Sequence, residues 1–242
     1  MTEFFSIGTY WGVRREPAHS CAERAQTFFQ SLRVRDPSFE QWYRAGRKLK
    51  GAPGIPIDMR SLQELTIRFQ KGQIHTDLNR RPMEELGFGL SVWTERAGRT
   101  RISMRCGVYS PFGSNVCLMN LPDQGEIAER LLTLPMMTQL LLDMVEAWDP
   151  DSGLVDTSDH MMLNPDETSV HARVGWVTYV SKSRGTIPPL PAPVRIDPVG
   201  DKGMLITLTP ERFTASNPEH VALAARVREL LDRAGLLRPP QQ

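Results

Sequence analysis

An alternation of apolar and polar residues between positions 88 and 108 constrains the fold of this 242-residue chain more than any other feature. A period of two places successive side chains on opposite faces of a strand. The chain turns near Ala97-Gly98, so the pattern predicts an antiparallel hairpin with one buried face. The apolar positions are Phe88, Leu90 and Val92 before the turn, and Ile102, Met104, Cys106 and Val108 after it.

Several other segments have strand composition, with β-branched and aromatic residues bounded by turn residues. Residues 4–11 predict a first strand, and 116–121 predict a strand beside the hairpin. Residues 171–180 predict a strand that is apolar on both faces, which is typical of a central position in a sheet. A second hairpin is predicted from 194–199 and 204–208, around Gly200-Asp201-Lys202-Gly203.

Helical spacing and capping residues predict the helices. Apolar residues recur at helical spacing over 22–32, and Ser61 with Glu64 three residues later has the spacing of a capping box. A helix is expected over 126–132, and Pro135 either kinks it or opens a second helix. Asn217-Pro218 starts a last helix that Gly235 ends. The prediction is a single α+β domain over residues 1–242, a mainly antiparallel sheet with helices packed on it.

Charge is distributed unevenly along the chain, although the formal net charge is only +1. Residues 1–110 hold 18 basic and 11 acidic residues, residues 111–170 hold one basic and 11 acidic residues, and residues 171–242 hold 10 basic and six acidic residues. The middle window therefore carries a net charge of −10. Such a block bears on the choice of partner and on association rate more than on the fold.

Most of the acidic window after residue 148 has the composition of a loop, with a short strand considered at Leu154-Val155. No basic residue lies between 149 and 167 to neutralise it. Two interpretations stay open, a solvated acidic face and a docking surface for a cationic partner. The candidate contact residues are Asp149, Asp151, Asp156, Asp159, Asp166 and Glu167.

Motifs for catalysis and cofactor binding are absent from the sequence. There is no GxGxxG, no GxxxxGK[ST] and no GxSxG. Asp156, Asp159 and His160 form the tightest group of metal-ligand types, which a hard cation or a hydrolytic reaction would use, but such a pattern is more typical of an acidic surface loop. We therefore expect no catalytic residues, no metal and no cofactor. The acidic window would also repel phosphate, so nucleic-acid binding is not expected.

The cysteines and tryptophans have the patterns of core residues. Cys21, Cys106 and Cys117 show no CxxC spacing, which favours small apolar fillers in a reducing compartment. Tryptophans at 11, 93, 148 and 176 lie in apolar-patterned segments and are predicted to be buried. Trp42 lies beside Tyr43 and near basic residues, so a surface anchor competes with a core position, and the core is favoured.

The start of the chain has no basic region followed by an apolar stretch, which argues against a signal peptide. The most apolar stretch, 131–145, is interrupted by polar residues and is too short to span a membrane. We expect a cytoplasmic protein without a membrane partner.

Three segments resemble a known family. They are the strand Arg173-Val174-Gly175-Trp176-Val177-Thr178-Tyr179-Val180, the run from Gly203 to Leu208 with the helix start at Asn217-Pro218-Glu219, and the first strand ending in Tyr10-Trp11-Gly12. Together they are similar to the immunity protein 52 family. The resemblance implies a protein encoded beside a bacterial polymorphic toxin, including nuclease toxins delivered by type VI secretion.

The resemblance implies a function by binding. The expected partner is a cognate toxin, basic where it binds nucleic acid, and an acidic inhibitor surface would mimic phosphate and occlude its site. No catalytic residue is carried over, because such proteins are inhibitors. Two alternatives remain open: an adaptor or chaperone that loads a secreted effector, and a metal-dependent hydrolase that uses Asp156, Asp159 and His160.

Overall fold

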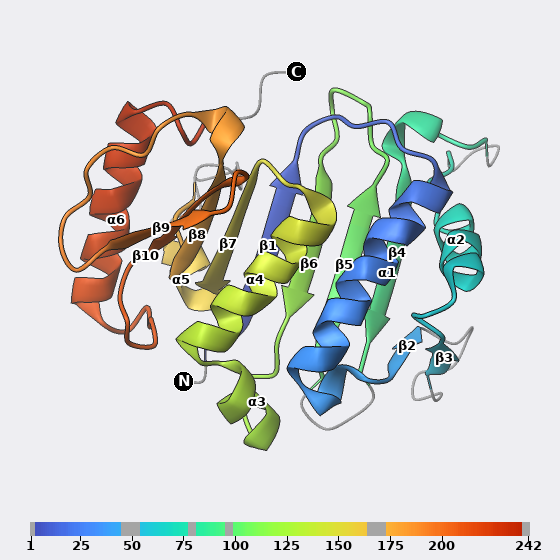
Figure 1. The fold of residues 1–242 in the computed structure, drawn as a ribbon, viewed down its shortest axis with the longest axis horizontal. Coiled ribbons are helices and arrows are strands. Elements are labelled where there is room, and N and C mark those ends of the chain that lie inside the picture. Colours follow the sequence, from blue (N-terminus) through green and yellow to red (C-terminus); the bar gives the residue numbers. More distant parts are fainter. Residues whose placement is uncertain (1–2, 45–53, 77–80, 95–98, 164–172, 239–242) are drawn as a thin grey trace.

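The computed structural model describes residues 3–44, 54–76, 81–94, 99–163 and 173–238. These residues form a ten-stranded sheet with helices packed on it (Figure 1). The strands are β1 (Phe5–Trp11), β2 (Trp42–Arg44), β3 (Ile55–Ile57), β4 (Phe88–Trp93), β5 (Arg101–Cys106), β6 (Asn115–Asn120), β7 (Ser152–Thr157), β8 (Val177–Ser181), β9 (Arg195–Val199) and β10 (Gly203–Thr207). The helices are α1 (Ala18–Arg35), α2 (Leu62–Lys71), α3 (Glu126–Leu131), α4 (Leu134–Trp148), α5 (Ser158–Leu163) and α6 (Pro218–Arg233).

The sheet order is β3-β2-β4-β5-β6-β1-β7-β8-β10-β9, and every neighbouring pair is antiparallel. This confirms the predicted α+β class. The first strand, β1, lies in the middle, between β6 and β7. Each edge strand contains a proline, Pro56 in β3 and Pro198 in β9. Proline cannot donate a hydrogen bond to a further strand, so both edges resist pairing with another sheet.

Local sequence signals account for most of the helices. The Ser61 side chain accepts a hydrogen bond from the Glu64 N–H at the start of α2, as the capping spacing predicted. Thr133 caps α4 through the Met136 N–H, so Pro135 opens a second helix rather than kinking the first. Asn217 caps α6, and Gly235 follows it with a φ of 76°. Positive φ values of this kind favour glycine.

Much of the core lies between the sheet and the layer formed by α1 and α4, which cross one face of the sheet side by side (Figure 1). Helix α6 contributes Ala224, Val227 and Leu231 to the same cluster of buried residues. Trp11 of β1 stacks on Trp148 of α4 with ring centroids 5.5 Å apart. The three cysteines are buried without disulfides, as predicted. None of the helices among the described residues is long and apolar enough to cross a membrane.

The opposite face of β4, β5 and β6 carries no helix from the described residues (Figure 1). Cross-strand pairing places Trp93, Arg101 and Asn120 in one row and Ser91, Ser103 and Leu118 in the next. We call this surface the open face and define it by side chains that are exposed or half-buried: Ser91, Trp93, Arg101, Ser103, Arg105, Val116, Leu118 and Asn120.

The open face corrects the prediction for one tryptophan, whereas a second tryptophan has the position that the sequence favours. Trp93, for which the sequence predicts burial, is half-exposed, because it follows Val92 and therefore points to the other face of the strand. Trp42 is 1% exposed and packs against Phe29 and Phe39, so the core position favoured for it is confirmed. The alternation of buried and exposed positions in the hairpin therefore predicts the exposure of Trp93 better than its aromatic character does.

The predicted acidic loop is also wrong for most of its described part. Residues 152–157 form β7, which pairs with β1 and β8, and residues 158–163 form α5. The Thr157 hydroxyl oxygen accepts a hydrogen bond from the His160 N–H and caps α5. The sequence predicts a loop here because acidic residues are unfavourable in a buried strand. A carboxylate can occupy such a strand only when tertiary partners compensate its burial, and those partners are not visible in the local sequence. The predicted strand over 171–180 begins only at Val177, and residues 171–172 lie outside the described ranges.

Candidate functional site

The structure does not bring the four described candidate carboxylates together. Two precede β7, one lies inside it, and one follows it in α5. A six-residue strand separates the two ends by about 20 Å. Two further candidates lie outside the described residues. Asp149 and Asp151 precede β7, Asp156 lies inside it, and Asp159 lies in α5. Asp166 and Glu167 are the two candidates outside the described residues.

Asp149 is the most accessible of the described candidates. It follows α4 with a left-handed backbone, φ 47°, and its side chain is 64% exposed. Its Oδ1 lies 3.7 Å from Lys202 Nζ, which also lies 3.5 Å from Glu146. Asp151 is half-buried, and its Oδ2 accepts a hydrogen bond of 2.8 Å from the Gly12 N–H. Asp149 can therefore meet a partner, whereas Asp151 holds the loop after β1.

Basic residues from distant segments contact part of the acidic window, both its carboxylates and the end of α4. Arg35 in α1 makes two hydrogen bonds to Asp143 in α4, at 2.8 and 2.9 Å. Arg14 Nη2 donates to the Trp148 carbonyl at 2.7 Å, and Arg24 Nη1 donates to the Ala147 carbonyl at 3.1 Å. Cations are favoured at the C-terminal end of a helix, where carbonyl groups lack partners. The charge asymmetry along the sequence is thus partly a pairing between the N-terminal segment and α4.

Asp156 and His160 form a buried pair rather than an open site. Asp156 is 1% and His160 is 6% exposed, and the His160 Nδ1 lies 2.8 Å from Asp156 Oδ1. Burial raises the pKa of Asp156, while the contact with His160 and the nearby charge of Arg173 act in the opposite direction. The ring of Phe213 meets the His160 ring edge-on. Asp156 therefore contributes to packing and is inaccessible to a macromolecular partner.

The same pair is the basis of the metal-site alternative. The cavity beside it measures about 20 Å³, which is about the space of one water molecule. Asp159 does not line this cavity, and its carboxylate accepts a hydrogen bond from the Ser158 hydroxyl. Among the described residues, no group of three His, Cys, Asp or Glu side chains has an arrangement that could hold a metal ion.

One end of the sheet carries a set of tied loops, which we call the rim. It comprises residues 12–17 after β1, 107–114 between β5 and β6, and 149–151 before β7. Buried Asn115 ties the first two loops, because its Nδ2 donates to the carbonyls of Gly12 and Val108 and its Oδ1 accepts from the Val108 N–H. Asp151 ties the third loop to the first. The rim is therefore a pre-formed surface.

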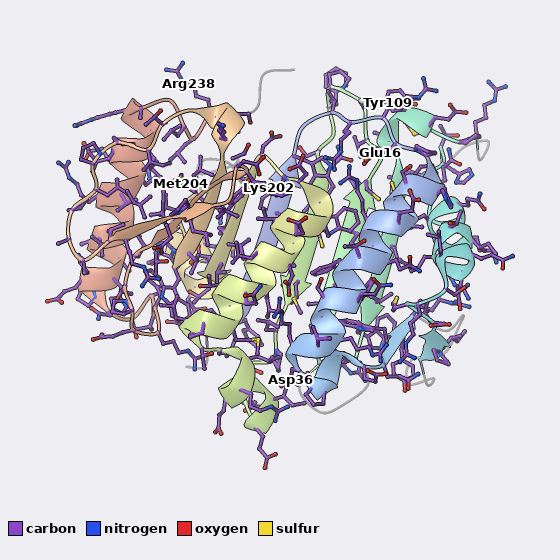
Figure 2. All side chains as sticks on the ribbon, in the orientation of Figure 1. Glu16, Asp36, Tyr109, Lys202, Met204 and Arg238 are labelled. Atoms are coloured by element: carbon purple, nitrogen blue, oxygen red, sulfur yellow. The ribbon has the colours of Figure 1, made fainter. Side chains whose placement is uncertain are left out.

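The rim presents aromatic and charged groups together. The Arg15 guanidinium lies 4.9 Å above the Tyr109 ring, beside a cavity of about 490 Å³ that Glu16 also lines. Phe112, at the tip of the loop between β5 and β6, is 96% exposed. Glu16, Tyr109 and Lys202 lie along this end of the sheet (Figure 2). Aromatic residues and arginine are typical of protein interfaces.

Phe112 is a surface residue that the strand, helix and charge patterns do not single out, although the sequence does carry a signal for it. A large aromatic residue stands in a Pro-Phe-Gly turn between two strands, where small or polar residues are usual. No local pattern marks Asn115, since its function is to hydrogen-bond two loops that are distant in sequence. The fold and these surfaces define an α+β protein with a pre-formed, exposed rim suited to contact with another protein.

Comparison with known proteins names the family. The sequence model of Immunity protein 52 matches residues 3–240, so the chain belongs to the immunity protein 52 family. The chain is also similar in fold to the Pseudomonas aeruginosa T6SS protein PA0821, at 14% identity and a TM-score of 0.56, over 95% of this chain and 76% of that one. Comparison with curated proteins gives no match.

Proposed function

We propose that this protein binds and neutralises a cognate secreted toxin in the cytoplasm, and that the toxin is a nuclease-type effector of type VI secretion. The observation that carries the proposal is membership of the immunity protein 52 family over nearly the whole chain. The likeness to a T6SS protein supports the fold and agrees with this setting.

The mechanism we propose is steric and electrostatic occlusion without covalent chemistry. A rim held by buried hydrogen bonds loses little conformational freedom on binding, which favours tight association. Phe112 supplies an exposed apolar contact, and Asp149 supplies negative charge toward a basic toxin. Complementary charges of this kind speed the encounter of two proteins. Asp156 is excluded from this contact by its burial.

Co-expression tests the function directly. The protein encoded beside this chain in the source genome is expressed in a naive bacterium with and without it, and growth and co-purification are followed. We expect the neighbour to stop growth alone, and this chain to restore growth and co-purify with it. An effector-loading adaptor would bind without restoring growth. A harmless neighbour, or rescue without binding, would refute the immunity function.

A charge-removing variant tests the acidic contact at Asp149. Asn tolerates the left-handed backbone at this position, so Asp149→Asn removes the charge without adding strain. We expect the association rate with the purified toxin to fall by a factor of about 2 to 10 at low salt. The matched control is Asp232→Asn, which removes an exposed carboxylate of α6 that is not among the candidate contacts and should leave the rate unchanged. Equal association rates for wild type and Asp149→Asn would remove Asp149 from the interface.

A further inference from the structure

The open face holds two arginines without partners in the described part of the chain. Arg101 and Arg105 are exposed on β5 and make no ion pair or side-chain hydrogen bond among the described residues. Many other arginines are paired, for example Arg35 with Asp143 and Arg130 with Asp36. An arginine in the middle of a sheet face without a carboxylate beside it leaves five donors to solvent or to a partner.

Apolar groups surround these two cations. Trp93 pairs across the strands with Arg101, and Val116 pairs with Arg105. Leu118 pairs with Ser103 in the row between them. All three apolar side chains are half-buried, although no described helix covers them. An apolar patch flanked by arginines on a rigid sheet is the composition of an interface centre.

The residues that define the open face include no carboxylate. Their cross-strand neighbours on β1 are Ser6, opposite Asn120, Gly8, opposite Leu118, and Tyr10, opposite Val116. None of these three residues is a carboxylate. The surface is therefore positive and partly apolar, although the whole chain is close to neutral at +1. A partner that covers it must provide negative charge around an apolar contact.

We propose that the open face is the docking surface for an acidic patch on the partner protein, with carboxylates binding Arg101 and Arg105. This rests on the proposed function, because the partner is then the cognate toxin. A toxin that is basic where it binds nucleic acid can carry such a patch elsewhere on its surface. Arginine binds carboxylates through two parallel hydrogen bonds, which also fixes the orientation of the complex.

Two other occupants fit the surface less well. In a two-fold dimer formed through this face, the arginines of both copies would lie close together and repel one another. A nucleic acid would need a more extensive basic surface than two arginines, and the chain as a whole lacks the net positive charge typical of such proteins. An acidic protein patch satisfies both the cations and the apolar side chains.

Charge reversal tests the docking surface. The double variant Arg101→Glu/Arg105→Glu is compared with wild type and with Lys71→Glu, a control at the exposed end of α2, which packs against α1. We expect the double variant to reduce the association rate with the purified toxin by about tenfold or more and to reduce its salt dependence. Lys71→Glu should behave as wild type. Melting temperatures should stay unchanged, because both arginines are exposed and make no ion pair among the described residues.

The outcomes separate the surface from the function. If wild type binds the toxin and restores growth, and the double variant does so equally well, the docking surface is refuted while the immunity function stands. If wild type neither binds nor restores growth, both are refuted. A concentration-dependent dimer of this chain, or salt-sensitive binding of an oligonucleotide, that disappears in the double variant would also overturn the proposal.

Discussion

Asp36 shows how a single carboxylate connects distant parts of this chain. Its side chain is 5% exposed, accepts two hydrogen bonds from Arg130, at 2.9 and 3.1 Å, and accepts another from the Ser38 N–H. The hydrogen bonds from Arg130 have the largest effect on the pKa of Asp36, which is lowered to about 2. Arg130 is the one basic residue of the acidic window, and it binds an acidic residue of the basic N-terminal segment. Position in the sequence therefore does not predict which charges remain free.

The pKa of Asp36 predicts how stability depends on pH. The folded carboxylate has a lower pKa than the unfolded one, so its contribution is present above about pH 4 and is lost as the pH falls toward 2. Asp36→Asn keeps an oxygen for the Ser38 N–H and removes the charge. We expect a loss of about 1–2 kcal/mol in the free energy of unfolding at pH 7, less than the full shift implies because Arg130 is half-exposed.

Urea denaturation at pH 7, 4 and 2 measures this loss. The free energies of unfolding of wild type and Asp36→Asn should become equal near pH 2. The control is Asp201→Asn, a change in an exposed turn that should have no effect at any of the three pH values. A difference that is constant with pH would assign the loss to packing instead of charge.

At the scale of elements, α4 is held by both charge and packing. Its apolar face packs on the sheet through residues such as Leu140, Leu141 and Met144. Asp143 points instead toward α1, where Arg35 binds both of its oxygens. Asp143 is 7% exposed and Arg35 is 32% exposed. A pair at this depth fixes how two helices lie side by side, although a pair of apolar residues could replace it.

A comparison of two variants tests the role of this pair. Arg35→Ala leaves a buried carboxylate with only Gln139 as a side-chain donor among the described residues, so we expect a loss of about 2 kcal/mol in the free energy of unfolding. Arg35→Met combined with Asp143→Leu should recover most of the stability, because no unpaired charge remains. Urea unfolding measures each variant. A double variant as unstable as Arg35→Ala would show that the loss comes from packing between α1 and α4.

At the scale of the whole molecule, one sheet and one core connect the two ends of the chain. Strand β1 pairs with β6 on one side and β7 on the other. The cluster of buried apolar residues contains members from β1 near the N-terminus and from α6 near the C-terminus. From this continuity we propose that the chain is a single domain, and we expect one cooperative unfolding transition.

The buried thiols report on that transition. Cys21, Cys106 and Cys117 are at most 1% exposed, and burial raises the pKa of Cys106 and Cys117. We expect no reaction with a thiol reagent at pH 8 in the native state, because the thiolate is the reactive form. All three thiols should react in urea. The urea concentration at which half of each thiol is labelled should equal the midpoint of the unfolding transition followed by circular dichroism. Labelling of one thiol at lower urea would show that part of the molecule opens independently.

Periodicity and caps in the sequence were enough to predict most elements. The hairpin of β4 and β5, the start of α2 after Ser61 and the start of α6 at Asn217 all depend on residues within a few positions of one another. Such interactions are local, so they are visible in the sequence. The family resemblance used short segments and is confirmed over residues 3–240.

Only the tertiary structure decided which charged residues are accessible and where strands lie in the sheet. Asp156 is hidden because β7 pairs between β1 and β8, and α5 folds back to place His160 against it. Arg101 and Arg105 are accessible because no described element covers their side of β5. The local sequence therefore determined most of the elements, whereas the burial and pairing of charges also depend on contacts between distant segments, such as that of Arg35 with Asp143, 108 positions away, which no local pattern encodes.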